Sequence, residues 1–427
     1  MLNAIILFAT FIGLIILGMP ISISIGIGAV VGALLGDFTI SSIPLLISNG
    51  SSNFSLVAIP YFVFLGNVMN MGGITDRMFE FAEACIGHIK GGLSQVNVFA
   101  SVIFAGVSGT SSADAAGLGL VEIRAMEKKG YELPFSVAIT MVSSILGPII
   151  PPSVSLLVFA SLTGTSVAKL FCAGIVPGVI VAVVLCMMNY WMCVTGRVKV
   201  PEPEPFSFKR LVTATKNGIL ALLCPVILLA TMLSGAITPT EAGVVGSLYS
   251  LFVAAVYGEL TLKKFWQACV DTVNSCALIM FLIGMGTALG WFLTAEQIPQ
   301  AVSNFLFSLT ENKYIILLMV NIILLVLGMF MDATAIQLIM VPILLPVMKM
   351  LGVDMIQFGV MVTLNILVGT MTPPFGLGLF IMASVSKLTI PEILKATKYY
   401  FIPVLGALFL ITYVPWLSTW LPNLLFG

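Results

Sequence analysis

Two stretches of this chain place the same polar and helix-breaking residues inside otherwise strongly apolar sequence. The first is a Gly/Ser/Thr/Asp cluster at 104–114, followed by Gly-Pro-Ile-Ile-Pro-Pro-Ser at 147–153. The second is a Gly/Met/Asp/Thr cluster at 328–334, followed by Gly-Thr-Met-Thr-Pro-Pro-Phe at 369–375. Paired interrupted apolar segments of this kind are typical of a transporter's binding site.

The spacing of these features indicates an internal duplication. Three landmarks recur at nearly constant separation: 219 residues between Pro20 and Pro239, 218 between Asp114 and Asp332, and 222 between Pro151 and Pro373. We therefore interpret the chain as two copies of one unit.

The composition excludes a soluble protein. Hydrophobic residues make up 59% of the chain and charged residues 8%, with a mean hydropathy of +1.14. Runs such as 179–188 and 315–327 do not alternate in polarity, so they predict helical spans rather than barrel strands. The fold class is thus an all-α polytopic membrane protein. The net charge of zero argues against nucleic acid as a partner.

Each half contains five apolar segments long enough to cross a bilayer. The first of them lacks a basic start and a cleavage site, so we interpret it as a span and not a signal peptide. The spans lie near residues 2–18, 20–36, 54–71, 134–162 and 170–194, and near 218–235, 239–257, 273–293, 357–386 and 399–420. Spans 134–162 and 357–386 are predicted to be broken helices at the midplane.

A further interrupted segment in each half, 92–122 and 314–348, either crosses fully or forms a re-entrant helical hairpin. With hairpins and an extracytoplasmic N-terminus, 15 of the 18 Lys and Arg residues fall on the cytoplasmic side, which favours the hairpins. Five crossings per half then make the two repeats inverted, with both termini extracytoplasmic.

Charged and proline-rich segments define the remaining organisation. Residues 196–217 have the composition of an extended cytoplasmic connector between a first repeat, 1–195, and a second, 218–427. Segments 74–90, 258–270 and 296–312 mix charged and apolar residues and are predicted to be helices lying in the membrane interface.

The interrupted segments have the oxygen atoms needed to bind an alkali cation. Prolines remove backbone donors and leave carbonyl oxygens unpaired, and Ser108, Ser111 and Thr372 add hydroxyls. We therefore predict one sodium site in each half. The alternative is that these are ordinary proline kinks whose hydroxyls bond to their own helices.

Asp114 and Asp332 are acidic residues within membrane segments, a costly placement that indicates function. Each could cap a half-helix, lie in or near a cation site, or carry a transported proton. Their matched positions favour a shared structural or cation role.

The middle of every span lacks Lys and Arg, so an anionic substrate would be held by helix N-termini, amides and hydroxyls. Arg124 is the nearest basic candidate, although it also fits a cytoplasmic cluster with Lys128 and Lys129. Isolated polar residues in the spans are more often helix-packing groups than ligands. The substrate candidates are Thr110, Ser112, Asp114, Arg124, Ser153, Thr334 and Thr370, with Asn53, Asn67, Asn70, Asn97, Thr140, Ser143, Ser144, Gln337 and Asn365 as further polar positions.

The runs 106–114, 147–153, 331–335 and 372–376 closely resemble the large membrane subunit of tripartite ATP-independent periplasmic (TRAP) transporters. The resemblance implies a sodium-driven elevator transporter of the bacterial inner membrane, with a small four-helix membrane subunit and a periplasmic substrate-binding protein as partners. It also implies an organic acid anion as substrate, either sialic acid or a four-carbon dicarboxylate. Carried over by motif, one sodium site would involve Ser108, Ser111, Gly147, Ile150 and Pro152, and the other Gly328, Asp332, Gly369 and Thr372.

Two other classes of protein compete with this interpretation. An ion channel can also use re-entrant hairpins, although inverted repeats suit alternating access better. An intramembrane enzyme is weaker, because a Gly-x-Ser-x-Gly motif and a His partner are missing. The chain also lacks a phosphate-binding loop, so a gradient must drive transport, and we expect no organic cofactor.

Overall fold

The computed structural model describes residues 2–36, 38–108, 111, 118–203, 205–233, 235 and 237–427. These residues form helices and no strand, which confirms the all-α prediction. Seven helices in the described part are long and apolar enough to cross a bilayer, and several shorter apolar helices accompany them. The protein is therefore a multi-pass membrane protein.

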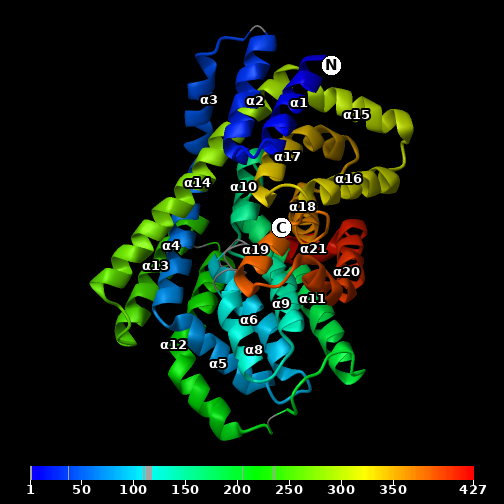
Figure 1. Cartoon of the computed structure of the whole chain (residues 1–427). Helices are drawn as coiled ribbons and strands as arrows, with labels where there is room; N and C mark the ends of the chain where they lie inside the picture. Colours follow the sequence, from blue (N-terminus) through cyan, green and yellow to red (C-terminus); the bar gives the residue numbers. More distant parts are fainter. Residues whose placement is uncertain are drawn as a thin grey trace.

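The chain begins with three helices at the upper end of Figure 1. Helix α1 (Leu2–Ile16) and helix α2 (Ile21–Leu35) are separated at Pro20, which precedes the first turn of α2. Helix α3 (Ser42–Ser51) was not predicted, and it packs against α14. A short 3₁₀ turn (Phe54–Val57) then leads into α4 (Ala58–Met71).

Two of the three predicted amphipathic segments are separate short helices, and one is not. They are α5 (Ile74–Ile86) and α15 (Ile298–Leu309). The prediction for 258–270 is wrong, because residues from Leu262 onward belong to α14 (Leu262–Ala295). At ~1.5 Å per residue, this 34-residue helix exceeds the ~30 Å apolar core of a bilayer. It runs obliquely across the molecule in Figure 1.

Among the described residues, each interrupted segment contains two helices and is followed by a helix that breaks at its Pro–Pro pair. In the first half these are α6 (Gly92–Ser108) and α8 (Leu118–Lys128), then α9 (Leu133–Ser143) and α10 (Val154–Thr163). In the second half they are α16 (Lys313–Gly328) and α17 (Ala333–Met350), then α18 (Met355–Thr370) and α19 (Leu377–Ser386). Both Pro–Pro peptide bonds, 151–152 and 373–374, are cis.

The remaining helices correct two predicted boundaries. Helix α11 (Val167–Val194) is followed by an extended connector that ends where α12 (Phe208–Leu233) begins, so the connector is shorter than the predicted 196–217. Helix α13 (Pro239–Val256) starts at Pro239 as predicted. The predicted span 399–420 is instead α20 (Ile390–Tyr413) and α21 (Trp416–Phe426), separated at Pro415.

The broken helices lie at the centre of the molecule (Figure 1), and the long helix α14 packs against the second interrupted segment through α17. Helix α14 contacts α2, α3, α4 and α17. Helix α6 packs on α9, α16 packs on α18, and α10 packs on α17, so both interrupted segments meet the broken helices (Figure 1). The first broken helix therefore contacts both the second broken helix and the second interrupted segment.

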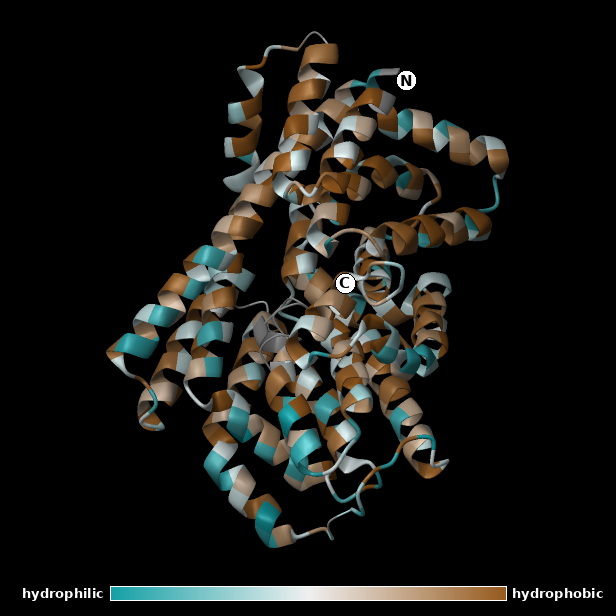
Figure 2. Ribbon diagram, viewed as in Figure 1, coloured by the Kyte–Doolittle hydropathy of each residue, from teal (hydrophilic) through white to brown (hydrophobic). Residues whose placement is uncertain are grey.

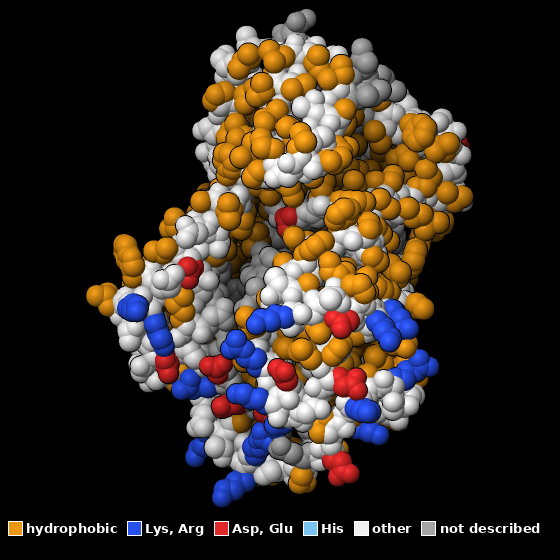
Figure 3. All heavy atoms as spheres, viewed as in Figure 1, with side chains coloured by type: hydrophobic (Ala, Val, Ile, Leu, Met, Phe, Trp, Pro, Cys, Tyr) orange, Lys and Arg blue, Asp and Glu red, His pale blue; other side chains and the backbone are white. Residues whose placement is uncertain are grey.

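Hydrophilic residues gather at one end of the molecule. Figure 2 shows them at the lower end, on α5, α8 and α12, and Figure 3 shows charged side chains gathered over the same region. On this face, the upper end around α2, α3 and α15 shows mainly hydrophobic side chains.

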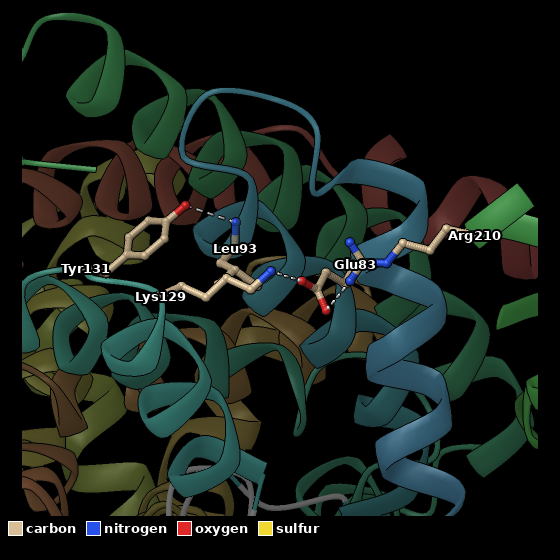
Figure 4. A network of polar contacts seen from close by, with 5 residues as sticks. All are labelled: Glu83, Leu93, Lys129, Tyr131 and Arg210. Carbon is tan, nitrogen blue, oxygen red and sulfur yellow. Dashed lines mark hydrogen bonds and ion pairs between the residues drawn. The ribbon is translucent and has the colours of Figure 1, made fainter. Parts of the chain in front are cut away.

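A polar network holds three helices together at this charged end (Figure 4). One carboxylate oxygen of Glu83 on α5 lies 2.7 Å from Lys129 Nζ, just after α8, and the other lies 3.1 Å from a guanidinium nitrogen of Arg210 on α12. Nearby, the Tyr131 hydroxyl accepts a hydrogen bond of 3.3 Å from the Leu93 N–H. Burial raises the pKa of Tyr131 to about 12, so its phenol stays protonated.

Candidate substrate and cation site

The first break is fully buried and closed by its own hydrogen bonds. Ser153 is the N-cap of α10: its Oγ accepts from the Leu156 N–H at 3.1 Å and donates to the Pro148 carbonyl. Gly147, Ile150 and Pro152, the three backbone positions predicted for a cation, lie in the same buried segment. Ser153 therefore holds the break in shape, with its hydroxyl both donating and accepting a hydrogen bond.

Helix α11 packs directly on this break through a glycine. A β-carbon added to Gly174 would lie 2.1 Å from the Ile149 carbonyl oxygen, closer than real side chains come. The Ile149 carbonyl therefore lies against α11. Only the other carbonyls of the break remain as candidates for a cation.

The second break is joined to the neighbouring hairpin turn. The N–H of Gly376 donates to the Met329 carbonyl at 2.7 Å, which links the segment after the Pro–Pro pair to the turn after α16. Pro373, Pro374 and Phe375 in this second break are exposed, whereas the residues of the first break are buried. The aromatic rings of Phe330 and Phe375, both half-exposed, lie 5.3 Å apart across this junction.

The hydroxyls of the second break donate hydrogen bonds to their own helix. This is the arrangement expected if the break is an ordinary proline kink. Thr372 donates to the Val368 carbonyl and Thr370 to the Leu367 carbonyl, each at 2.7 Å. A donating hydroxyl oxygen still has lone pairs to offer a cation. The bonds therefore fix the orientation of these oxygens and are compatible with either interpretation.

Asp332 caps a helix. It is the N-cap residue of α17, and its carboxylate accepts a hydrogen bond of 2.9 Å from the Thr334 N–H. Of the three roles considered for this residue, the geometry supports capping. Asp114, its counterpart in the first half, lies outside the described residues.

A cavity of about 530 Å³ lies where the two halves meet. Figure 3 shows a hollow at mid-height of the molecule, beside α4 and α14. One wall comes from α4 and α14, and the other from the breaks and hairpin turns. The polar lining residues are Asn67, Asn70, Ser111, Ser155, Ser275, Asp332 and Thr334.

The polar side chains that line the cavity are mostly uncharged amides and hydroxyls, and none of the described ones is Lys or Arg. Asp332 is the only charged side chain among the described residues that line it. Asn67 donates from Nδ2 to Thr272 Oγ1 at 3.0 Å, and Asn70 accepts from Thr75 at 3.1 Å. The N-terminal turns of α10 and α17 contribute Ser155 and Thr334, and the N–H groups of a first helical turn attract anions.

The structure brings together part of the predicted site. Ser111, Asp332 and Thr334 line the cavity. Ser153 and Thr370 are buried and are not among the described residues that line it. Arg124 is exposed on α8. Thr110 and Ser112 lie outside the described residues, as does the side chain of Ser108.

The sequence analysis passed over two residues that line this cavity and one buried carboxylate elsewhere on α8. Ser155 and Ser275 line the cavity, and Ser275 follows Asp271, Thr272 and Asn274 on α14. Glu122 on α8 is 1% exposed. A buried carboxylate inside a membrane segment is a signal that could have identified Glu122 as a candidate.

Comparison with known proteins shows what this chain is similar to. Residues 8–417 match the family model described as tripartite ATP-independent periplasmic transporter, DctM component. The chain is 36% identical to the sialic acid TRAP transporter large permease SiaM of Vibrio cholerae, over 98% of each chain. It is also 36% identical to the C4-dicarboxylate TRAP transporter large permease DctM of Pseudomonas aeruginosa, over 93% of this chain and 92% of that protein.

The fold is similar to that of a solved transporter. The crystal structure of YdaH from Alcanivorax borkumensis aligns with a TM-score of 0.64 over 88% of each chain, at 14% identity. At this level of identity the likeness concerns the fold alone.

Proposed function

The chain belongs to the DctM component family of tripartite ATP-independent periplasmic transporters, and from this premise we propose that it carries out sodium-coupled uptake of an organic acid anion. It is a transporter subunit and not an enzyme. The observation that carries the proposal is the cavity between the halves, which is lined by amides, hydroxyls and two helix N-termini.

The proposed cations are sodium ions transported with the substrate. The first site would use Ser108 and Ser111 with the backbone of Gly147, Ile150 and Pro152. The second would use Gly328, Gly369 and Thr372, with Asp332 acting as the cap of α17 beside it. Neutral oxygens at breaks in membrane helices support this assignment, because such ligands suit a hard monovalent cation.

The proposed substrate is a carboxylate such as sialic acid or a four-carbon dicarboxylate, as the names of the two relatives suggest. A carboxylate would be held without Lys or Arg, by the helix N-termini of α10 and α17 and by the amides of Asn67 and Asn70. Such neutral donors retain an anion without binding it so strongly that release becomes slow.

The proposed mechanism is an elevator motion of two inverted repeats, each formed by five crossings and a re-entrant hairpin. Its support is the repeated order of hairpin and broken helix in the two halves. We place the chain in a bacterial inner membrane with both termini periplasmic. The gathering of charged side chains at one end supports one cytoplasmic face (Figure 3).

We also propose two partners, a small four-helix membrane subunit and a periplasmic binding protein that delivers substrate. The test is uptake into proteoliposomes by the chain alone and by the complete set, with sialic acid and a four-carbon dicarboxylate compared at low micromolar concentration. We expect saturable uptake of one substrate only with both partners. Full uptake by the chain alone would contradict the tripartite assignment.

A further inference from the structure

A buried amide ties the first hairpin to the helix that breaks behind it. Asn97 on α6 is fully buried, and its Nδ2 donates to Thr140 Oγ1 on α9 at 2.7 Å. Its Oδ1 accepts from Ser143 Oγ, also on α9, at 2.7 Å. Both ends of the Asn97 carboxamide are thus bonded to one neighbouring helix.

A second buried amide does the same in the other half. Asn365 on α18 is fully buried, and its Nδ2 donates to Asn321 on α16, at 2.6 Å to Oδ1 and 3.0 Å to the carbonyl oxygen. Asn321 in turn donates to the Leu317 carbonyl and to Thr412 Oγ1. Asn365 Oδ1 has no hydrogen-bond partner among the described residues, so the side chain of Asn365 is held through its Nδ2.

The two ties occupy matched positions in the duplicated sequence. Asn97 and Asn321 are 224 residues apart, and Ser143 and Asn365 are 222 apart, close to the 218 to 222 separating the landmarks of the breaks. Each tie joins the first helix of a hairpin to the first part of a broken helix.

Three of the four tie residues also lie close to the proposed cation ligands along their helices. Ser143 precedes Gly147 by four residues, and Asn365 precedes Gly369 by four, which is about one helical turn. Asn321 precedes Gly328 by seven, or about two turns. Asn97 lies farther away, eleven residues before Ser108, or about three turns. In the second half both helices, and in the first half α9, are therefore pinned within about two turns of a proposed ligand.

We propose that the Asn97–Ser143 and Asn321–Asn365 ties are positioning elements for sodium: they fix the distance between hairpin and broken helix and thereby set sodium affinity. The inference rests on the sodium sites of the proposed function. Its physical basis is that ligands on two different helices must be held within a fraction of an ångström to bind an ion well. A buried amide that loses its partner is costly, so the paired arrangement is strongly preferred.

The chain offers a matched control for each tie. Gln95 lies two residues from Asn97 on α6, is also buried, and bonds to the Cys186 carbonyl on α11. Gln357 lies on α18, is also buried, and bonds to the Thr412 carbonyl on α20. Each control substitution removes a buried amide bond between two helices, and neither of these bonds joins a hairpin helix to a broken helix.

The test compares Ser143→Ala and Asn365→Ala with Gln95→Ala and Gln357→Ala. Each purified variant is titrated with sodium chloride, with potassium chloride as the ionic-strength control, and its melting temperature is recorded at each concentration. Sodium-dependent uptake by the complete transporter is the second measurement. Asn365→Leu, which keeps the side-chain volume, replaces Asn365→Ala if the latter cannot be purified.

We expect the tie variants to raise the half-saturating sodium concentration by roughly 3-fold to 100-fold in both measurements. The control variants should lower the melting temperature in the absence of sodium and leave the half-saturating concentration unchanged. The proposal is overturned by equal shifts in tie and control variants, or by tie variants that keep the wild-type value. A wild-type protein indifferent to sodium would instead overturn the proposed function on which the inference rests.

Discussion

Gly328 and Gly369 touch through their backbones: a β-carbon added to Gly369 would lie 2.6 Å from the α-carbon of Gly328. The reverse addition, on Gly328, would lie 2.8 Å from the Ile366 carbonyl oxygen and 2.9 Å from the Gly369 α-carbon. The ends of α16 and α18 therefore meet at a point where only hydrogen fits. Both glycines belong to the proposed second cation site.

This contact predicts the effect of the smallest possible side chain. Gly328→Ala and Gly369→Ala should each force the two helix ends apart and lower stability by about 1–3 kcal/mol. The affinity for sodium should fall as well, since the substitution displaces the backbone of Gly328 and Gly369, which are proposed ligands. Gly406→Ala is the control, because nothing lies within 4 Å of its added β-carbon in α20. Thermal unfolding of the purified variants measures the difference, and equal melting temperatures in all three would contradict the packing account.

The hydroxyls proposed as sodium ligands can be removed without adding bulk. Ser108→Ala, Ser111→Ala and Thr372→Ala should each raise the half-activating sodium concentration by roughly 5-fold to 150-fold, for a lost ligand worth ~1–3 kcal/mol. Thr419→Ala is the control, because this partly buried threonine makes the same kind of bond to a carbonyl four residues earlier. Unchanged sodium dependence in all three ligand variants would refute the site assignment.

Asp332 allows the capping role to be separated from a cation role. Asn caps helices as well as Asp, so Asp332→Asn should keep near-normal transport, whereas Asp332→Ala should cost about 1 kcal/mol of stability. Uptake and thermal unfolding of both variants are measured at several sodium concentrations. A loss in Asp332→Asn that added sodium partly restores would point to a cation ligand instead. Loss of a strong pH dependence in that variant would favour proton carriage.

Glu83 should contribute to the cohesion of the charged end. Its carboxylate is only 14% exposed, while the side chains of Lys129 and Arg210 are 39% and 44% exposed, so solvent partly screens the two pairs. Glu83→Gln should therefore lower stability by about 1 kcal/mol, with a smaller effect at high salt. Glu259→Gln, which removes an exposed pair with Lys264, should change little. An equal effect of the two substitutions, or a salt-independent one, would contradict this account.

The sidedness of the hairpins can be tested by labelling. After replacement of the seven native cysteines, a cysteine at Lys128 should react with an impermeant thiol reagent only from the cytoplasm, and one at Lys349 only from outside. Both positions are exposed in the structure. Labelling of position 128 from outside would mean that the segment 92–122 crosses completely, and the inverted-repeat interpretation would fail.

The helices and their breaks could be predicted because apolar length and Pro/Gly placement are local signals. The Pro–Pro pairs located both broken helices, and Pro239 located the start of α13. Helix α3 was missed because it is short and mixes polar with apolar residues. The interruption at Pro415 was missed because the flanking sequence remains apolar.

The candidate site was harder to predict, since it depends on which helices pack together. Asp332 and Thr334 stood out as polar residues in an interruption, but Ser275 on α14 has no such local signal. It lines the cavity only because α14 packs beside α4 and α17. The amide ties could not be predicted either, because Asn97 and Asn365 on their own resemble ordinary helix-packing groups.

The most direct test of the central claim is accumulation of substrate driven by sodium alone. The complete transporter is reconstituted in proteoliposomes with binding protein and labelled substrate outside, and either a sodium or a potassium gradient directed inward. We predict uptake above the external concentration with the sodium gradient, and its loss when an ionophore collapses that gradient. Equal accumulation in the potassium gradient, with sodium absent on both sides, would contradict sodium coupling.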